Sequence, residues 1–151
     1  EVTVQYKLQG ILSLTSAPST IDFGSLTYNA TTQRIEDPMI DMPLIVTDTR
    51  ANVESGWHVT ASLSTPMRNN EGKELINALR FVYNGQEEVL NTNAQMIYSN
   101  NSSGVDNINI SDNWGTEAGT DGVKFQIDAR DIVHTGRFEG VVTWKVMAGQ
   151  P

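Results

Sequence analysis

The sequence contains no cysteine, which excludes disulfide bridges, thiolate metal sites and cysteine nucleophiles. Basic residues are scarce, because 10 Lys and Arg stand against 18 Asp and Glu and give a formal net charge of −8. Nucleic acids and anionic lipid surfaces are bound through clustered Lys and Arg, so this balance argues against both as partners. No apolar run approaches the roughly 18–20 residues of a transmembrane helix. We therefore expect no membrane insertion.

Helical periodicity and catalytic motifs are also sparse. Only residues 71–79 place apolar side chains at helical spacing, which predicts one or two short helical turns. The sequence has no nucleophile elbow, phosphate-binding loop or dinucleotide-binding glycine pattern. Carboxylate pairs such as Asp128 and Asp131 are typical of a solvated acidic surface. We predict that the protein is not an enzyme and uses no cofactor.

Metal-binding patterns are equally weak. His58 and His134 are far apart, and without cysteine or an HExxH pattern they predict no zinc site. We expect both histidines to face solvent. Asp106, Asp112 and Asp121 offer oxygen ligands, but their spacing does not match the calcium loop of an EF-hand. The favoured interpretation is a loop with Asx turns, and calcium binding stays a minor alternative.

The pattern that dominates the sequence has a period of two. Apolar and polar side chains alternate in residues 57–63, and the alternation recurs in residues 138–146. Asn84-Gly85 lies between two apolar runs and predicts a type I′ hairpin turn. Further short strands are expected at 3–8, 11–15, 44–47, 80–83, 95–98, 107–110 and 123–127. Many short strands with frequent turns suggest an antiparallel sandwich or barrel, and we predict an all-β antiparallel sandwich.

A length of 151 residues fits one domain, which we expect to span 1–151, with 1–9 as a leading strand or linker edge. The most polar and irregular stretch, around 100–122, is predicted to be a long loop or an insertion. It carries Trp114, whose ring either stacks on a sugar or partner surface or folds back to cap the sandwich. Trp57 and Trp144 lie on apolar strand faces and are expected to anchor the core.

Two tryptophan segments share a pattern with a known family. In each, Val stands two residues after Trp on a predicted strand, and an Asp-x-Arg turn precedes the first. The residues are Asp48, Arg50, Gly56, Trp57, Val59, Thr143, Trp144 and Val146. The pattern resembles that of WxL domains, the non-covalent cell-wall attachment modules of Gram-positive surface proteins, and the similarity covers about residues 10–151. Both motifs carry Val where the strict form has Leu, a mild change on a strand face.

The resemblance implies a secreted protein retained in the cell wall of a Gram-positive bacterium. It implies peptidoglycan as the ligand and other surface proteins of the same assembly as partners. It also ties wall association to Trp57 with Val59 and to Trp144 with Val146, although the alternation places these side chains on inward strand faces. Inward placement would make the motif a signature of the fold.

Two alternatives from other classes remain. One is a protein–protein assembly domain that docks a partner surface protein by strand or loop contacts. The other is a host-directed adhesin in which Trp114 contacts a glycan.

Asp48 and Arg50 are interpreted as a turn with a local ion pair, and an exposed pair of that kind contributes about 0–1 kcal/mol.

Overall fold

The computed structural model describes residues 10–50, 56–101, 106–131 and 133–151. These residues form strands and one 3₁₀ turn, η1 (Ile110–Asn113), so the predicted all-β fold is confirmed. The strands are β1 (Leu12–Ser16), β2 (Ile21–Asp22), β3 (Gln33–Ile35), β4 (Met39–Ile40), β5 (Ile45–Asp48), β6 (Trp57–Arg68), β7 (Leu79–Tyr83), β8 (Gln86–Val89), β9 (Gln95–Asn100), β10 (Asp106–Asn109), β11 (Gly122–Ile127) and β12 (Glu139–Ala148). The strand expected at 3–8 lies outside the described residues.

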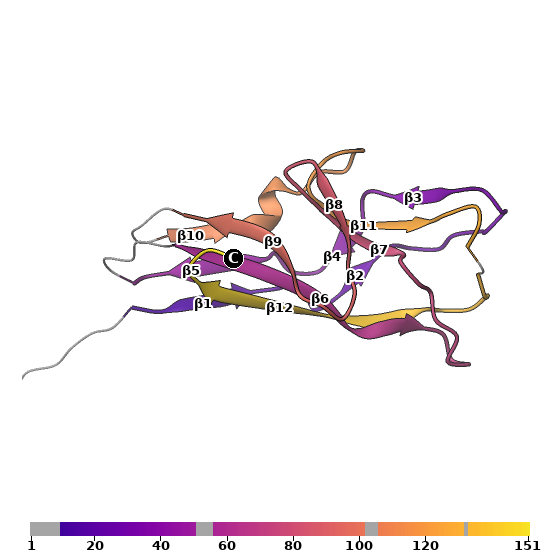
Figure 1. Cartoon of the computed structure of the whole chain (residues 1–151), viewed down its shortest axis with the longest axis horizontal. Coiled ribbons are helices and arrows are strands. Elements are labelled where there is room, and N and C mark those ends of the chain that lie inside the picture. The colour runs from indigo at the N-terminus through magenta and orange to yellow at the C-terminus, as the bar shows by residue number, and fades with distance from the viewer. Residues whose placement is uncertain (1–9, 51–55, 102–105, 132) are drawn as a thin grey trace, which may run out of the picture.

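The described residues form four antiparallel sheets. Their strand orders are β1-β5-β10, β3-β11-β7-β8, β12-β6-β9 and β2-β4. Figure 1 shows the paired β6 and β12 running along the long axis. The β1-β5-β10 sheet lies towards one end of this pair and the β3-β11-β7-β8 sheet towards the other. The long pair is thus shared by both ends of the sandwich.

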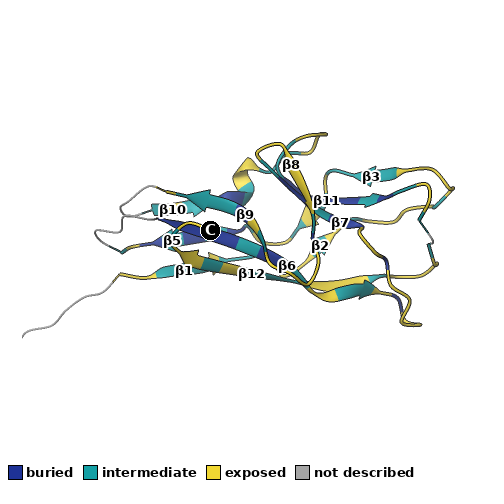
Figure 2. Ribbon diagram, in the orientation of Figure 1, coloured by how far each residue is buried: buried dark blue, intermediate teal, exposed yellow. Residues whose placement is uncertain are grey.

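The main core lies where the inward faces of these sheets meet. Its buried side chains come from five strands and include Val46, Trp57, Phe81, Ile97 and Val123. Figure 2 shows the buried residues of β6 concentrated in the half that begins at Trp57 and the exposed ones in the other half. Period-two alternation explains this core, because every second residue of a strand points to the same face.

The loop between β7 and β8 adopts the predicted turn. Asn84 and Gly85 both have positive φ, 51° and 77°, as the two central residues of a type I′ turn require. Tyr83 pairs with Gln86 across the turn, so the hairpin closes with a two-residue loop. The turn therefore fixes the register of β8 against β7.

The helical turns predicted for residues 71–79 are wrong. Gly72 and Asn77 have positive φ, 77° and 60°, which interrupts any helical run. Glu74 forms an antiparallel bridge with Arg68, so the segment extends the ladder at the end of β6. The apolar spacing arises because this extended segment buries Leu75 and Ala78 in a second, smaller core.

The stretch around 100–122 contains more structure than a loop. Its described part holds β10, close to the strand expected at 107–110, followed by η1. β10 pairs with β5, so this stretch completes a sheet. The short strands β2, β3 and β4 have too few residues to show alternation and were not predicted.

Replacing Trp57 with Ala should destabilise the fold by about 3–5 kcal/mol, because the ring has 0% exposure and its removal leaves a cavity in the main core. Chemical denaturation followed by circular dichroism measures the change. Met39→Ala is the control, since Met39 is 77% exposed and its truncation should leave stability within about 0.5 kcal/mol. An unchanged unfolding midpoint in Trp57→Ala would contradict the structural role of this tryptophan.

Candidate functional site

The two Trp-x-Val motifs lie side by side on adjacent strands. In the β6–β12 ladder Val59 pairs with Val146, and Ala61 pairs with Trp144. Directly paired residues share a sheet face, so both tryptophans and both valines point to the same side. That side faces the core, because Trp57 and Val59 are fully buried. The structure therefore brings all four motif residues together on an inward face.

The two motif tryptophans have different surroundings. Trp57 is sealed in the core and stacks on Tyr98, with ring centroids 5.5 Å apart and an interplanar angle of 29°. Trp144 is only half-buried. Its ring stacks on Trp114 at 6.1 Å and also lines a large groove. Of the two, only Trp144 lies where a ligand can reach it without unfolding the protein.

Trp114 folds back onto the sandwich. Besides stacking on Trp144, its ring makes an edge contact with Phe81, with centroids 5.7 Å apart and an interplanar angle of 75°. Gly122 allows this approach, because a Cβ there would lie 3.1 Å from the Cβ of Trp114. The ring is half-buried by these contacts. Of the two placements expected for Trp114, the structure shows the cap.

Asp48 and Arg50 form a two-pronged ion pair at the end of β5. Arg50 donates from Nε to Oδ1 of Asp48 at 2.9 Å and from Nη2 to Oδ2 at 3.0 Å. The same Nη2 donates to the carbonyl oxygen of Gly56 at 3.1 Å, which connects the pair to the start of β6. These hydrogen bonds from Arg50 lower the pKa of Asp48 below its usual value. The expectation of an exposed pair is wrong, because the Asp48 carboxylate is buried.

Gly56 lies directly before Trp57, at a position with no room for a side chain. It has a positive φ of 64°, and a Cβ at this position would lie 1.9 Å from the carbonyl oxygen of Asn100. The Gly149 amide donates to the Gly56 carbonyl at 3.0 Å, so the start of β6 is tied to the end of β12. A side chain at position 56 would push the start of β6 away from Asn100. The glycine before Trp57 is thus a steric requirement of the fold.

His58 is buried, so the prediction that both histidines face solvent is wrong for this residue. Its Nδ1 donates to the carbonyl oxygen of Gly149 at 2.8 Å, at the crossing where Gly56 also meets Gly149. Alternation placed His58 correctly on the face opposite Trp57, but the returning C-terminal residues cover that face. His134 is exposed. Among the described residues, no group of three or more His, Asp or Glu gathers to hold a metal ion.

A groove of about 1380 Å³ runs beside the second motif. Its walls are the segment 18–28, the ends of β6 and β12 away from the first motif, and the segment 133–142. Its aromatic lining consists of Phe23, Tyr28, Phe125, Phe138 and Trp144. Its polar lining includes Ser19, Asp22, His134, Thr135 and Arg137. A recess with aromatic faces and scattered polar groups suits a ligand that offers both hydroxyl or amide groups and apolar faces. Alternation alone did not reveal this groove, because segments 18–28 and 133–142 are mostly irregular.

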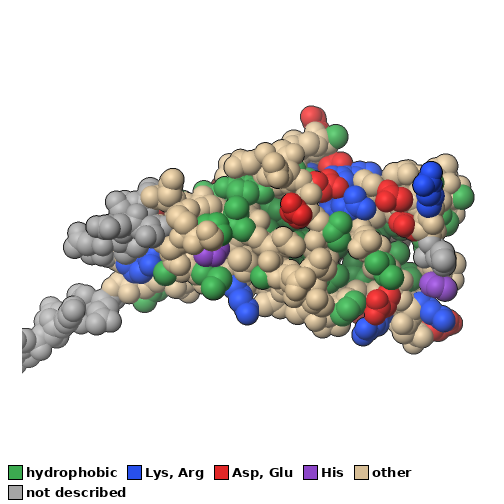
Figure 3. Space-filling model, viewed as in Figure 1, with side chains coloured by type: hydrophobic (Ala, Val, Ile, Leu, Met, Phe, Trp, Pro, Cys, Tyr) green, Lys and Arg blue, Asp and Glu red, His purple; other side chains and the backbone are tan. Residues whose placement is uncertain are grey.

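Charges on the surface are mixed. In the face shown in Figure 3, basic and acidic side chains lie next to one another over β3, β7 and β8. There Glu87 pairs with Arg34 at 2.6 Å and with Arg80 at 3.1 Å. Basic side chains in this region are thus neutralised by neighbours within the protein.

In the described part of the chain, no helix is long and apolar enough to cross a membrane.

The family model described as "WxL domain surface cell wall-binding" matches residues 3–149. No curated protein and no solved structure matches the chain. The matched range includes the Asp48–Arg50 pair and both Trp-x-Val segments.

Asp48→Asn should lower stability by about 2 kcal/mol at neutral pH, because Arg50 loses its charged acceptor. The pKa of Asp48 is lower in the folded state, so the pair stabilises the fold above the unfolded-state pKa of about 4. That stabilisation is lost as the pH falls through the folded-state pKa. Urea unfolding at several pH values should therefore show a weaker acid dependence in Asp48→Asn than in the wild type.

Asp112→Asn is the matched control for this measurement, because Asp112 is exposed. It should follow the wild-type pH dependence. An Asp48→Asn variant with wild-type stability at every pH would show that the ion pair contributes nothing to the fold.

Proposed function

Because this chain belongs to the WxL family of surface cell-wall-binding domains, we propose that it binds peptidoglycan non-covalently at the surface of a Gram-positive bacterium. We further propose that residues 1–151 act as one binding domain and that the protein catalyses no reaction. The observation that carries the proposal is the groove beside Trp144, where a motif residue meets an accessible recess.

The proposal divides the motif residues into two roles. Trp57, Val59 and Asp48 are buried and, together with the partly buried Arg50, hold the fold. Trp144 faces the groove and is the motif residue proposed to contact the ligand. Val146 pairs with Val59 and supports the ladder from which Trp144 projects. Wall association then depends on the motif both through the fold and through the half-buried ring of Trp144.

The charge of the protein limits how such binding can work. Peptidoglycan and teichoic polymers are anionic, and a protein with a net charge of −8 gains no long-range attraction towards them. Binding must therefore depend on hydrogen bonds and apolar contacts over short distances. Ser19, Thr135 and the rings of Tyr28 and Trp144 line the groove and supply both kinds of contact.

Binding to purified cell walls should change little between about 0.05 and 0.5 M salt, because short-range contacts are not screened as long-range charge interactions are. Sedimentation of the protein with walls at increasing NaCl measures this. A steep loss of binding over that range would show that charge attraction, and not the groove contacts, holds the protein at the wall.

Leu26→Ser should weaken binding to protein-free peptidoglycan about five-fold, because Leu26 is 41% exposed and lines the groove. Ile76→Ser is the matched control, since Ile76 is 65% exposed and lies outside the groove lining. Both variants should keep the wild-type melting temperature. Equal binding by the two variants would remove the groove as the peptidoglycan site.

A second candidate function is docking of a partner surface protein by strand addition. Among the named strands, β12 lies at the edge of its sheet, and its outer face exposes Val141 and Met147. An open edge with exposed apolar side chains can accept a further strand. Retention on walls that carry their proteins, with none on protein-free peptidoglycan, would favour this function.

The host-directed adhesin has less support, because Trp114 is packed against Phe81 and Trp144.

A further inference from the structure

A second, smaller pocket lies between the β7–β8 hairpin and β9. It has a volume of about 330 Å³ and shares no lining residue with the groove beside Trp144. Its apolar surfaces come from Phe81, Ile97 and Met96, with Tyr83 at the side. The pocket is thus a separate feature, and neither Trp-x-Val motif contributes to it.

Polar side chains occupy core-facing positions in this pocket. In the hairpin, Phe81 pairs with Glu88 and Tyr83 pairs with Gln86, so all four side chains share a face. Phe81 belongs to the main core, which identifies that face as the inward one. An inward position on a strand of a sandwich is ordinarily apolar. Gln86 and Glu88 nevertheless remain exposed, because β8 is the edge strand of its sheet, so their polar groups are accessible at the rim of the pocket.

Gln95 completes the set from the opposite strand. It pairs with Ala61, a fully buried residue of the main core, so it too projects from an inward face. Gln95 lines the pocket together with Gln86 and Glu88. Three polar side chains from two different sheets therefore converge on one recess with an apolar floor.

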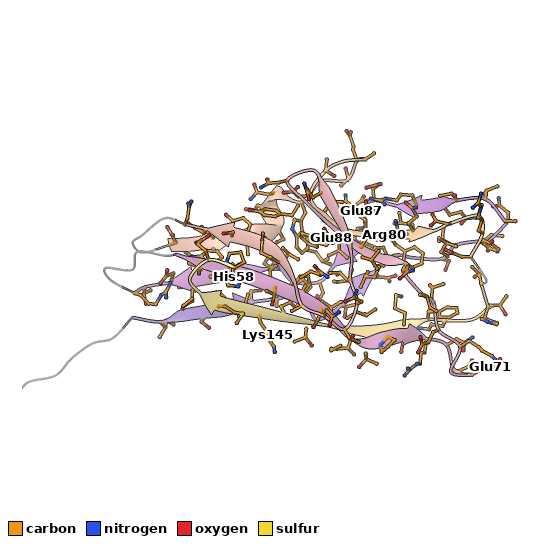
Figure 4. The ribbon with its side chains drawn as sticks, in the orientation of Figure 1. His58, Glu71, Arg80, Glu87, Glu88 and Lys145 are labelled. Atoms are coloured by element: carbon orange, nitrogen blue, oxygen red, sulfur yellow. The ribbon has the colours of Figure 1, made fainter. Side chains whose placement is uncertain are left out.

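These three side chains have free hydrogen-bonding groups. Within the described part of the chain, Gln86, Glu88 and Gln95 make no side-chain hydrogen bond or ion pair. Glu87, their neighbour, is different: it points to the outer face and pairs with Arg34 and Arg80. Figure 4 shows Glu87 and Glu88 together on β8 beside Arg80. The sequence thus uses one carboxylate of β8 for the fold and leaves the other available in the pocket.

We propose that this pocket binds a single neutral sugar ring. Two carboxamides and one carboxylate can donate to and accept from neighbouring hydroxyl groups, and the carboxylate offers only acceptors. Met96, which is 37% exposed, and the half-buried ring of Tyr83 supply an apolar surface for the C–H face of the sugar, whereas Phe81 and Ile97 are buried in the floor of the pocket. The volume lies at the small end of ligand sites, which suits one ring better than a polymer. Glu88 and the net charge of −8 disfavour phosphorylated or carboxylated ligands.

The sugar can come from two sources, the amino sugars of a bacterial wall or the neutral hexoses of other glycans. Titration of ¹⁵N-labelled protein with free N-acetylglucosamine and, separately, with galactose distinguishes them by nuclear magnetic resonance. We expect saturable shifts confined to β7, β8 and β9, including the side-chain amide signals of Gln86 and Gln95. The sugar that produces these shifts identifies the source.

Glu88→Gln and Gln95→Ala should each weaken the binding about ten-fold. Glu71→Gln is the matched control, because Glu71 is exposed and lies at the far end of the molecule in Figure 4. It should bind sugar like the wild type, and all three variants should keep the wild-type melting temperature. Leu26→Ser, which alters the groove, should also leave the sugar shifts unchanged, so failure of this proposal is distinguishable from failure of wall binding.

The proposal is overturned if neither sugar produces saturable shifts in the pocket. It is also overturned if Glu88→Gln and Gln95→Ala bind as tightly as Glu71→Gln. Inward-pointing charges also protect edge strands from aggregation, and β8 lies at the edge of its sheet. A Glu88→Gln variant that aggregates, together with a wild-type protein that binds neither sugar, would assign Glu88 that protective role instead.

Discussion

The antiparallel ladder between β6 and β12 joins two segments that are far apart in the sequence, and both ends of the sandwich depend on it. A shift of one residue in this pairing would move Trp144 and Val146 from the inner face to the outer one, because side chains alternate along a strand. The crossing at Gly56 and Gly149 opposes such a shift. There the backbone hydrogen bond and the contact from His58 hold the two strand ends in one register.

That ladder explains how one short motif can serve both the fold and the proposed binding surface. The two Trp-x-Val segments are not equivalent copies, because Trp57 begins β6 in the sealed core whereas Trp144 lies further along the ladder beside the groove. Loss of binding after a change at Trp57 would therefore reflect a damaged fold. A change at Trp144 acts on a ring that is partly accessible and shares its packing with Trp114.

Alternation in the sequence predicted much of this fold, because strand periodicity depends on local order alone. It identified β6 and β12, and the Asn84-Gly85 pair predicted the hairpin turn. It did not reveal that His58 and Asp48 are buried, since their cover comes from Gly149 and Arg50 at the strand ends. The groove was equally hidden, because strands and irregular segments that are far apart in the sequence meet to form its walls.

Under the proposed function, an acidic protein of a wall-binding family meets an anionic polymer without help from its net charge. Several basic groups are paired within the protein: Arg50 is held by Asp48, and Arg34 and Arg80 share Glu87. The fully buried Lys124 donates to the carbonyl oxygens of Glu36 and Gly115, each at 2.9 Å. Arg and Lys side chains that are already paired in this way exert little attraction on a distant phosphate or carboxylate. Under the proposed functions, selectivity then comes from the two recesses, where a ligand is recognised by shape and hydroxyl placement after contact.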